Sequence, residues 1–247
     1  MKDDNKLNKK IETAVDTAQR AQRNYDLSVD IPSSDLNTLI YAATNSPSKQ
    51  NETHYQLHVI TDSSIIYQIY NQTKKFTLGI KEALDETKGE EWLYMNKSVK
   101  NSQVNANALF VYVDDDGSAR GATHLKGKHG EEFSKQVLDE QKNYSVGISV
   151  GELILSSALL GYKSGICSAF DVDQTADILK TDKQPRLLVG VGVDSVNTER
   201  TLHSETYNKD LPVEYRTGDL DQKWQFPSFE KQCKVYLNNV EYSNKNA

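Results

Sequence analysis

The sequence predicts an α+β fold in which one sheet packs between helices. The expected helices and strands follow one another without the regular strand–helix–strand alternation of a doubly wound sheet. The 247 residues include only 13 Gly and 5 Pro, which disfavours a turn-rich all-β fold. Apolar residues make up 37% of the chain, below the ~45–50% of an average soluble domain. A single chain is therefore expected to have a lean core.

The charge balance and the apolar runs disfavour several classes of protein. The chain has 29 Lys and Arg against 35 Asp and Glu, and the net charge of −6 disfavours a nucleic-acid partner. No apolar run reaches the ~18–20 residues that a bilayer span needs, and no apolar segment follows the start MKDDNKLNKK. The two cysteines, Cys167 and Cys233, belong to no metal-binding motif. We therefore expect a cytoplasmic protein with no membrane partner.

No Pro-, Gly- or Ser-rich stretch divides the chain, so the sequence predicts a single domain over residues 1–247. Its ends, 1–10 and 240–247, are expected to be flexible. The last part, 194–247, has few apolar runs apart from 235–237. We expect it to form an extension that lies on the surface or on a partner.

The first half of the chain is expected to alternate helices with one strand. Apolar residues three and four apart predict an amphipathic helix over 5–23. A second helix over 36–43 follows Ser and Asp side chains that can cap it. Residues 55–60 are rich in β-branched and aromatic side chains and predict a strand, and 61–64 can cap a third helix. The polar segment 76–103 is expected to form short helices with a flexible connection.

In the second half, the apolar run 108–113 predicts a central strand, and the turn at 114–117 ends it. The three Asp of this turn lack the glycine and the next acidic ligand of an EF-hand loop, so a calcium site is not expected. The remaining elements are expected to be a helix over 131–142, a helix over 146–160 that is buried on most sides, a short strand, a helix from Asp173 to Leu179 and a buried strand over 186–193.

Two further patterns resemble parts of known ligand sites. His54 and His58 have no third ligand near them in the sequence, so no metal site is expected. Gly190 and Gly192 lack the third glycine and the following helix of a dinucleotide-binding fingerprint. They indicate a strand end that is tightly packed.

One polar loop could hold a ligand. Residues 46–51 place hydroxyl, ammonium and amide groups between a helix and a strand, where they can converge on a ribityl phosphate, although ordinary turns share this composition. Arg20 and Arg23 stand near the end of the first helix and can bind phosphate oxygens with paired donors. Cations at a helix C-terminus are favourable in any case, so both interpretations stay open.

Several segments match the motifs of a known family in order. RAQRNY (20–25) follows in part the motif Arg-Arg-Ser-x-Arg-x-Phe/Tyr, and PSKQNETHY (47–55) is similar to Pro-Ser-Ser-x-Asn-x-Gln-Pro-Trp. VNANA (104–108) precedes a strand, GISVGEL and ALLGY (147–162) mark a buried helix, and Phe170 follows a short strand. By these matches, over residues 20 to about 193, the chain resembles the FMN-dependent nitroreductase family.

The resemblance implies an α+β homodimer with a central, mainly antiparallel sheet flanked by helices and a C-terminal extension wrapped over the partner. It implies an oxidoreductase that takes hydride from NADH or NADPH and passes electrons through FMN to a small-molecule acceptor, such as a nitroaromatic or a quinone, in alternating half-reactions. Because the flavin carries the redox chemistry, no catalytic side chain is expected.

By the same resemblance, FMN would lie in a groove between the subunits. Arg20, Arg23 and Lys49 would contact its phosphate end, and other residues its ribityl chain and ring. The implied cofactor-binding residues are Arg20, Arg23, Pro47, Ser48, Lys49, Asn51, Ser168, Ala169 and Arg200.

The chain departs from the family pattern at three places. Ala21 replaces a Ser, residues 53–55 replace Gln-Pro-Trp, and 203–206 lack the basic residues that complete the phosphate grip. Arg200 is near enough to substitute for them, and Arg216 is a poorer candidate. These departures leave one alternative open, a non-catalytic or divergent flavin-binding relative; a flavin-consuming or dehalogenating enzyme is less favoured.

Overall fold

The computed structural model describes residues 2–19, 21–22, 24–73, 76–82, 91–115, 130–195, 235–237 and 240–242. The chain divides into two compact units, residues 1–200 and 201–247. The expected start of the extension, residue 194, lies close to this division. In the second unit, β7 (Val235–Leu237) and β8 (Val240–Tyr242) form an antiparallel pair.

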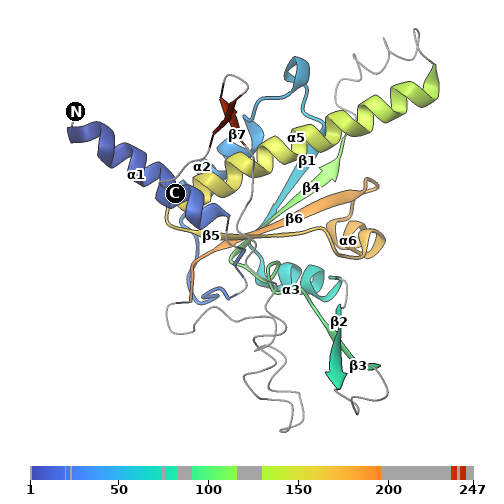
Figure 1. Ribbon diagram of the computed structural model, residues 1–247. Helices are drawn as coiled ribbons and strands as arrows, with labels where there is room; N and C mark the ends of the chain where they lie inside the picture. The colour runs from blue at the N-terminus through green and yellow to red at the C-terminus, as the bar shows by residue number, and fades with distance from the viewer. Residues whose placement is uncertain are drawn as a thin grey trace. The chain divides into compact units, whose positions relative to one another are not determined.

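The first unit is built around a four-stranded sheet in the order β1-β4-β6-β5, in which every neighbouring pair is antiparallel (Figure 1). Its strands are β1 (Tyr55–Ile60), β4 (Ala108–Asp114), β5 (Lys163–Cys167) and β6 (Pro185–Gly192). The expected antiparallel sheet is confirmed, and so are the strands expected near 55–60, 108–113 and 186–193. As expected, β4 is an interior strand.

Helices cover both faces of this sheet. The helices are α1 (Lys2–Ala18), α2 (Ser33–Thr44), α3 (Ser63–Asn71), α5 (Glu131–Leu159) and α6 (Val172–Leu179). On one face, Phe110 and Tyr112 of β4 pack in a cluster that includes residues of α2 and α5. On the other face, Leu109 and Val111 pack in a cluster that includes residues of α3 and α6. Because successive side chains of a strand point to opposite faces, β4 is apolar along its whole length.

The helix starts only partly follow the expected caps. The carboxylate of Asp62 accepts a hydrogen bond from the backbone N–H of Ser64 (2.8 Å) and caps α3 as expected. In α6, Asp171 and not Asp173 is the cap, because its carboxylate accepts from the N–H of Gln174 (3.0 Å). The first helical turn of α2 follows Pro32 and has no side-chain cap.

The expectation of short helices over 76–103 is wrong. The segment contains two strands, β2 (Phe76–Glu82) and β3 (Glu91–Val99), which pair antiparallel. Aromatic and β-branched residues recur within both strands and favour extended backbone, which weighs more than the polar composition around them.

The expectation of two helices over 131–160 is also wrong, because α5 is one helix of 29 residues. No proline interrupts residues 143–145, so the helical hydrogen bonds continue through them. The segment is not buried on most sides either: Gly147, Ile148 and Gly151 are exposed, while Ser149, Val150 and Leu153 are buried. In the described part of the chain, no helix is long and apolar enough to span a membrane.

Candidate functional site

The expected site residues fall at two edges of the sheet. The loop 46–51 leads into β1, whereas Ser168 and Ala169 follow β5. The strand directions place both segments at the same end of the sheet, because β1 begins there and β5 ends there. However, β4 and β6 lie between the two edge strands, which corresponds to three strand spacings or roughly 14 Å. Within one chain, the loop 46–51 and Ser168–Ala169 therefore lie apart.

The loop at the β1 edge presents polar groups on the surface. Pro47, Lys49 and Asn51 are exposed and Ser48 is half-buried. Lys49–Asn51 form a single 3₁₀ turn, which is closed by hydrogen bonds from Asn51 N–H to Ser48 O (3.2 Å) and from Glu52 N–H to Lys49 O (3.1 Å). Asn51 has a φ of +56°, a left-handed conformation that Asn tolerates better than most residues. The loop thus exposes an ammonium and an amide group beside a half-buried hydroxyl.

At the β5 edge, the backbone around Ser168 is held on both sides. The ladder with β6 ends at the pair Cys167–Leu188, and the buried Cys167 thiol donates a weak hydrogen bond to Ala169 O (3.6 Å). Burial raises the pKa of this thiol, so it stays neutral. Beyond it, Asp171 N–H donates to Gln72 O (2.8 Å). Ser168, between these anchors, is exposed.

Arg20, Arg23 and Arg200 lie outside the described residues, but the backbone beside the first two is described. Gln22 N–H donates to Ser164 O (2.8 Å) on β5, and Asp26 N–H donates to Val193 O (2.9 Å). Gln22 therefore lies beside β5, and Asp26 lies beside the residue that follows β6. Ser164 precedes Ser168 by four residues, which is about 13 Å along an extended strand.

Glycines on β5 and β6 allow Gln22, Gln103 and Asn107 to lie close to these strands. A Cβ on Gly165 would stand 2.6 Å from Gln22 O and 2.7 Å from Gln103 Cβ, closer than real contacts allow. Gly190 and Gly192 meet Gln103 and Asn107 in the same way. The expectation of a tightly packed strand end at Gly190 and Gly192 is confirmed.

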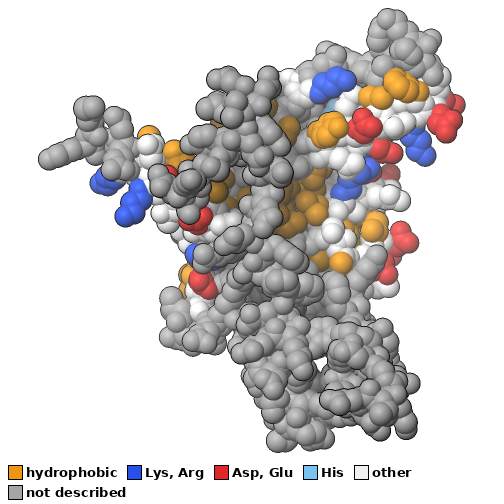
Figure 2. Space-filling model, viewed as in Figure 1, with side chains coloured by type: hydrophobic (Ala, Val, Ile, Leu, Met, Phe, Trp, Pro, Cys, Tyr) orange, Lys and Arg blue, Asp and Glu red, His pale blue; other side chains and the backbone are white. Residues whose placement is uncertain are grey.

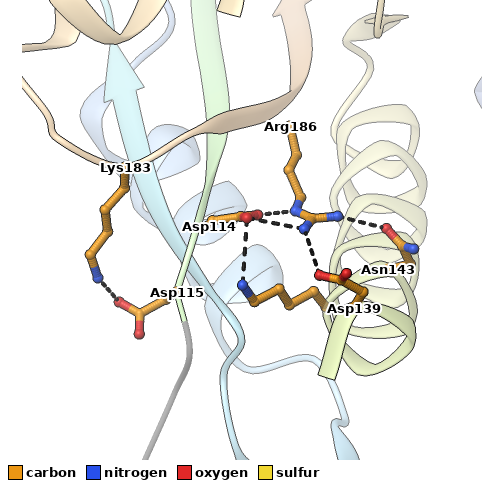
Figure 3. Close-up of polar contacts among 7 residues, drawn as sticks. Asp114, Asp115, Asp139, Asn143, Lys183 and Arg186 are labelled. Carbon is orange, nitrogen blue, oxygen red and sulfur yellow. Dashed lines mark hydrogen bonds and ion pairs between the residues drawn. The ribbon is translucent and has the colours of Figure 1, made fainter. Parts of the chain in front are cut away.

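An ion-pair network lies at the end of the sheet where β4 ends and β6 begins (Figure 3). The guanidinium of Arg186 on β6 donates to both carboxylate oxygens of Asp114 at the end of β4, and also to Asp139 (3.4 Å) on α5. Lys142 of α5 lies 3.5 Å from the same Asp114. Partial burial lowers the pKa of Arg186. No local pattern in the sequence indicates this network, because only the pairing of β4 with β6 brings Arg186 next to Asp114.

His54, three residues after the polar loop, has a buried imidazole. Its Nε2 is 3.7 Å from a carboxylate oxygen of Glu52, and neither ring nitrogen has a hydrogen-bond partner among the described residues. No group of three or more His, Cys, Asp and Glu in the described ranges could hold a metal ion.

These features define a class of protein. The antiparallel sheet between helix layers, with a polar loop at one edge and an anchored strand exit at the other, is a nitroreductase fold. The model of the nitroreductase family matches residues 17–193, and the chain belongs to this family. A comparison with curated proteins gives no match.

Solved structures with the same fold share little sequence with the chain. A candidate NAD(P)H:FMN oxidoreductase from Staphylococcus epidermidis is 15% identical with a TM-score of 0.54, over 83% of this chain and 92% of that one. A candidate nitroreductase from Exiguobacterium sibiricum, in complex with FMN, is 16% identical with a TM-score of 0.53, over 83% and 94%. The NfrA1 nitroreductase from B. subtilis is 12% identical with a TM-score of 0.54, over 86% and 77%.

Proposed function

We propose that the protein is an FMN-dependent oxidoreductase that takes hydride from NAD(P)H and passes electrons to a nitroaromatic, quinone or similar acceptor in alternating half-reactions. The observation that carries this proposal is the family match over residues 17–193, which includes both the loop 46–51 and Ser168–Ala169. The structure of the FMN-bound relative from Exiguobacterium sibiricum supports the choice of cofactor.

The described residues fit such a cofactor. When bound, FMN supplies the two-electron chemistry, so the protein needs groups that bind and orient it rather than a nucleophile. At the β5 edge, the backbone of Ser168 and Ala169 lies beyond the paired part of the strand and would face the ring. Arg20, Arg23 and Arg200, which lie outside the described residues, would hold the phosphate.

At the β1 edge, the exposed loop would contribute the remaining contacts. Pro47, Ser48 and Asn51 would contact the ribityl chain and the ring edge, and the ammonium of Lys49 would approach the phosphate. The 3₁₀ turn of the loop and its hydrogen bonds fix the backbone that carries these side chains.

We further propose that the site is completed in a homodimer. The two groups of residues lie at opposite edges of one sheet, so the β5 edge of one chain and the β1-edge loop of its partner would enclose a single cofactor. The C-terminal extension, residues 194–247, would wrap over the partner. This arrangement also supplies apolar contacts that the lean core of one chain lacks.

The exposed face of α5 supports this dimer. Tyr144 and Ile148 of this face are 65% and 43% exposed. Nearer the start of the helix, hydrophobic side chains stand among charged ones at the upper right of Figure 2, where Figure 1 places the first turns of α5. Alanine Cβ atoms at Gly147 and Gly151 would meet nothing within 4 Å. Glycine in a helix interior costs ~1 kcal/mol relative to alanine, and the close approach of a second helix would explain two of them on one face.

Spectroscopy of the purified protein tests the proposed function. Bound flavin absorbance that bleaches with NADH or NADPH and recovers with a quinone would support it. Arg23→Ala should weaken FMN binding, whereas Lys135→Ala, an exposed lysine near the start of α5, should not. Colourless protein that does not bind added FMN would contradict the proposal, and binding without turnover would favour the non-catalytic relative.

A further inference from the structure

The last turn of α2 has a buried carbonyl without its usual donor. In a helix, the C=O of Ala43 would accept from the N–H of residue 47, but that residue is Pro47, which has no N–H. Ala43 is fully buried, so water cannot replace the missing donor. A buried carbonyl in this position needs a side-chain partner.

Two buried hydroxyls supply that partner. The phenol of Tyr55 on β1 donates to Ala43 O, and the hydroxyl of Ser149 on α5 donates to the same oxygen at 2.6 Å. The two lone pairs of the carbonyl are thus both used. Three separate elements, α2, β1 and α5, meet at this one atom.

Each hydroxyl group has one proton, and this determines which group donates in each hydrogen bond of the network. Ser149 has one hydroxyl proton and uses it on Ala43, so the hydrogen bond of 2.9 Å between Ser149 Oγ and Tyr112 Oη is donated by Tyr112. By the same count, Ser46 donates to Tyr55 Oη over 3.5 Å. Burial raises the pKa of Tyr112, which keeps it a proton donor. The hydroxyl protons of Tyr55 and Ser149 therefore point to Ala43 O, and those of Ser46 and Tyr112 point to these two hydroxyl oxygens.

We propose that Tyr55, Ser149 and Tyr112 are positioning residues that set the loop 46–51 for cofactor binding. The loop starts three residues after Ala43 and ends four residues before Tyr55, so both of its ends depend on this network. The role in cofactor binding rests on the proposed function. Because Ser149 belongs to α5, the network also joins the loop to the helix whose other face we assign to the dimer.

Three variants test the proposal. Tyr55→Phe and Ser149→Ala each remove one donor to Ala43 O and keep most of the packing. The matched control is Tyr162→Phe, which removes a hydrogen bond of 2.7 Å to Asp35. Asp35 lies in the first turn of α2, at the opposite end of this helix from the loop. Thermal unfolding of each variant shows which of them fold and how much stability each loses.

Amide hydrogen exchange of the cofactor-free protein measures the loop directly. In peptides that cover residues 45–54, Tyr55→Phe and Ser149→Ala should raise exchange about tenfold, which corresponds to about 1.4 kcal/mol. In both variants the FMN dissociation constant should also rise, by about three- to tenfold. Tyr162→Phe should change neither quantity, even where its loss of thermal stability matches that of the other two.

Each other result overturns the proposal. Loop exchange equal to that of the wild type shows that the hydroxyls do not hold the loop. Faster exchange with unchanged FMN affinity removes the role in cofactor binding, and an equal loss of affinity in Tyr162→Phe shows a general effect of stability. If the wild type itself fails to bind FMN, the proposed function falls, and the exchange comparison alone then decides whether the network holds the loop.

Discussion

Arg186 binds Asp114 across the strand pair β6 and β4 through two guanidinium nitrogens, and Lys142 of α5 approaches the same carboxylate. Arg186 and Asp114 are mostly buried, and the side chain of Lys142 is only 9% exposed. The network thereby fastens the long helix α5 to the end of the sheet. Charges in such a place are stabilising only while they remain paired.

Asp114→Asn should destabilise the protein. The substitution keeps the shape of the side chain but leaves Arg186 and Lys142 beside a neutral group, at a cost of about 1–3 kcal/mol. In a unit of this size, the midpoint of thermal unfolding should fall by about 2–4 °C per kcal/mol. The control is Asp115→Asn, whose partner Lys183 is 37% exposed, so that its loss should cost less than about 1 kcal/mol. Equal effects of the two variants would contradict this account.

Gly165→Ala should also destabilise the protein, for a steric reason. The added methyl group would overlap Gln22 O and the side chain of Gln103, so the backbone at Gln22 must move away from β5. Overpacking of this kind costs about 1–3 kcal/mol. Denaturant unfolding measures the loss, and faster amide exchange at Gln22 would locate it. A variant as stable as the wild type would show that the segment lies further from the strand.

Gly147→Ala and Gly151→Ala test the proposed dimer face. If α5 were exposed to solvent there, each alanine should stabilise the protein by up to about 1 kcal/mol through helix propensity. In a close helix contact the methyl groups should instead weaken association. We expect the second result, measured by sedimentation over a range of protein concentrations. An unchanged oligomeric state with higher thermal stability would exclude this face as the interface.

The stability of the protein should fall at alkaline pH in part through Tyr162. Burial, with the carboxylate of Asp35 beside it, raises the pKa of this phenol to about 12 from the ordinary 10. A pKa that is raised in the folded state stabilises the fold below pH 10, and this contribution is lost as the pH rises through 12. Tyr162→Phe should therefore show a shallower loss of stability between pH 10 and 12. Parallel curves for the two proteins would refute the assignment.

Local patterns were sufficient for much of the fold. The apolar run 108–113 and the β-branched runs near 55–60 and 186–193 predict strands because extended backbone is favoured by the residues themselves. Local patterns do not reveal the strands of the segment 76–103, since these are short runs within a polar stretch. The pattern over 131–160 predicts two helices because the apolar content changes along its length, although the backbone hydrogen bonds of the single helix α5 continue throughout.

The candidate site was predictable only as separate pieces. The composition of residues 46–51 indicates a polar loop, and the order of motifs indicates the family. Neither shows that this loop and Ser168 lie at opposite edges of one sheet, because strand order depends on pairings between distant residues. The signal that could have revealed the hydroxyl network is the spacing of Pro47 four residues after Ala43.

The sequence by itself determined three strands of the sheet, near 55–60, 108–113 and 186–193, together with the polar loop and the family, because these depend on neighbouring residues and on motif order. Only the tertiary structure decided which strands are edges, which carboxylate Arg186 binds and which hydroxyls satisfy Ala43 O. The physical reason is that buried polar groups must find partners, and the partners available are set by long-range register and packing rather than by distance along the chain.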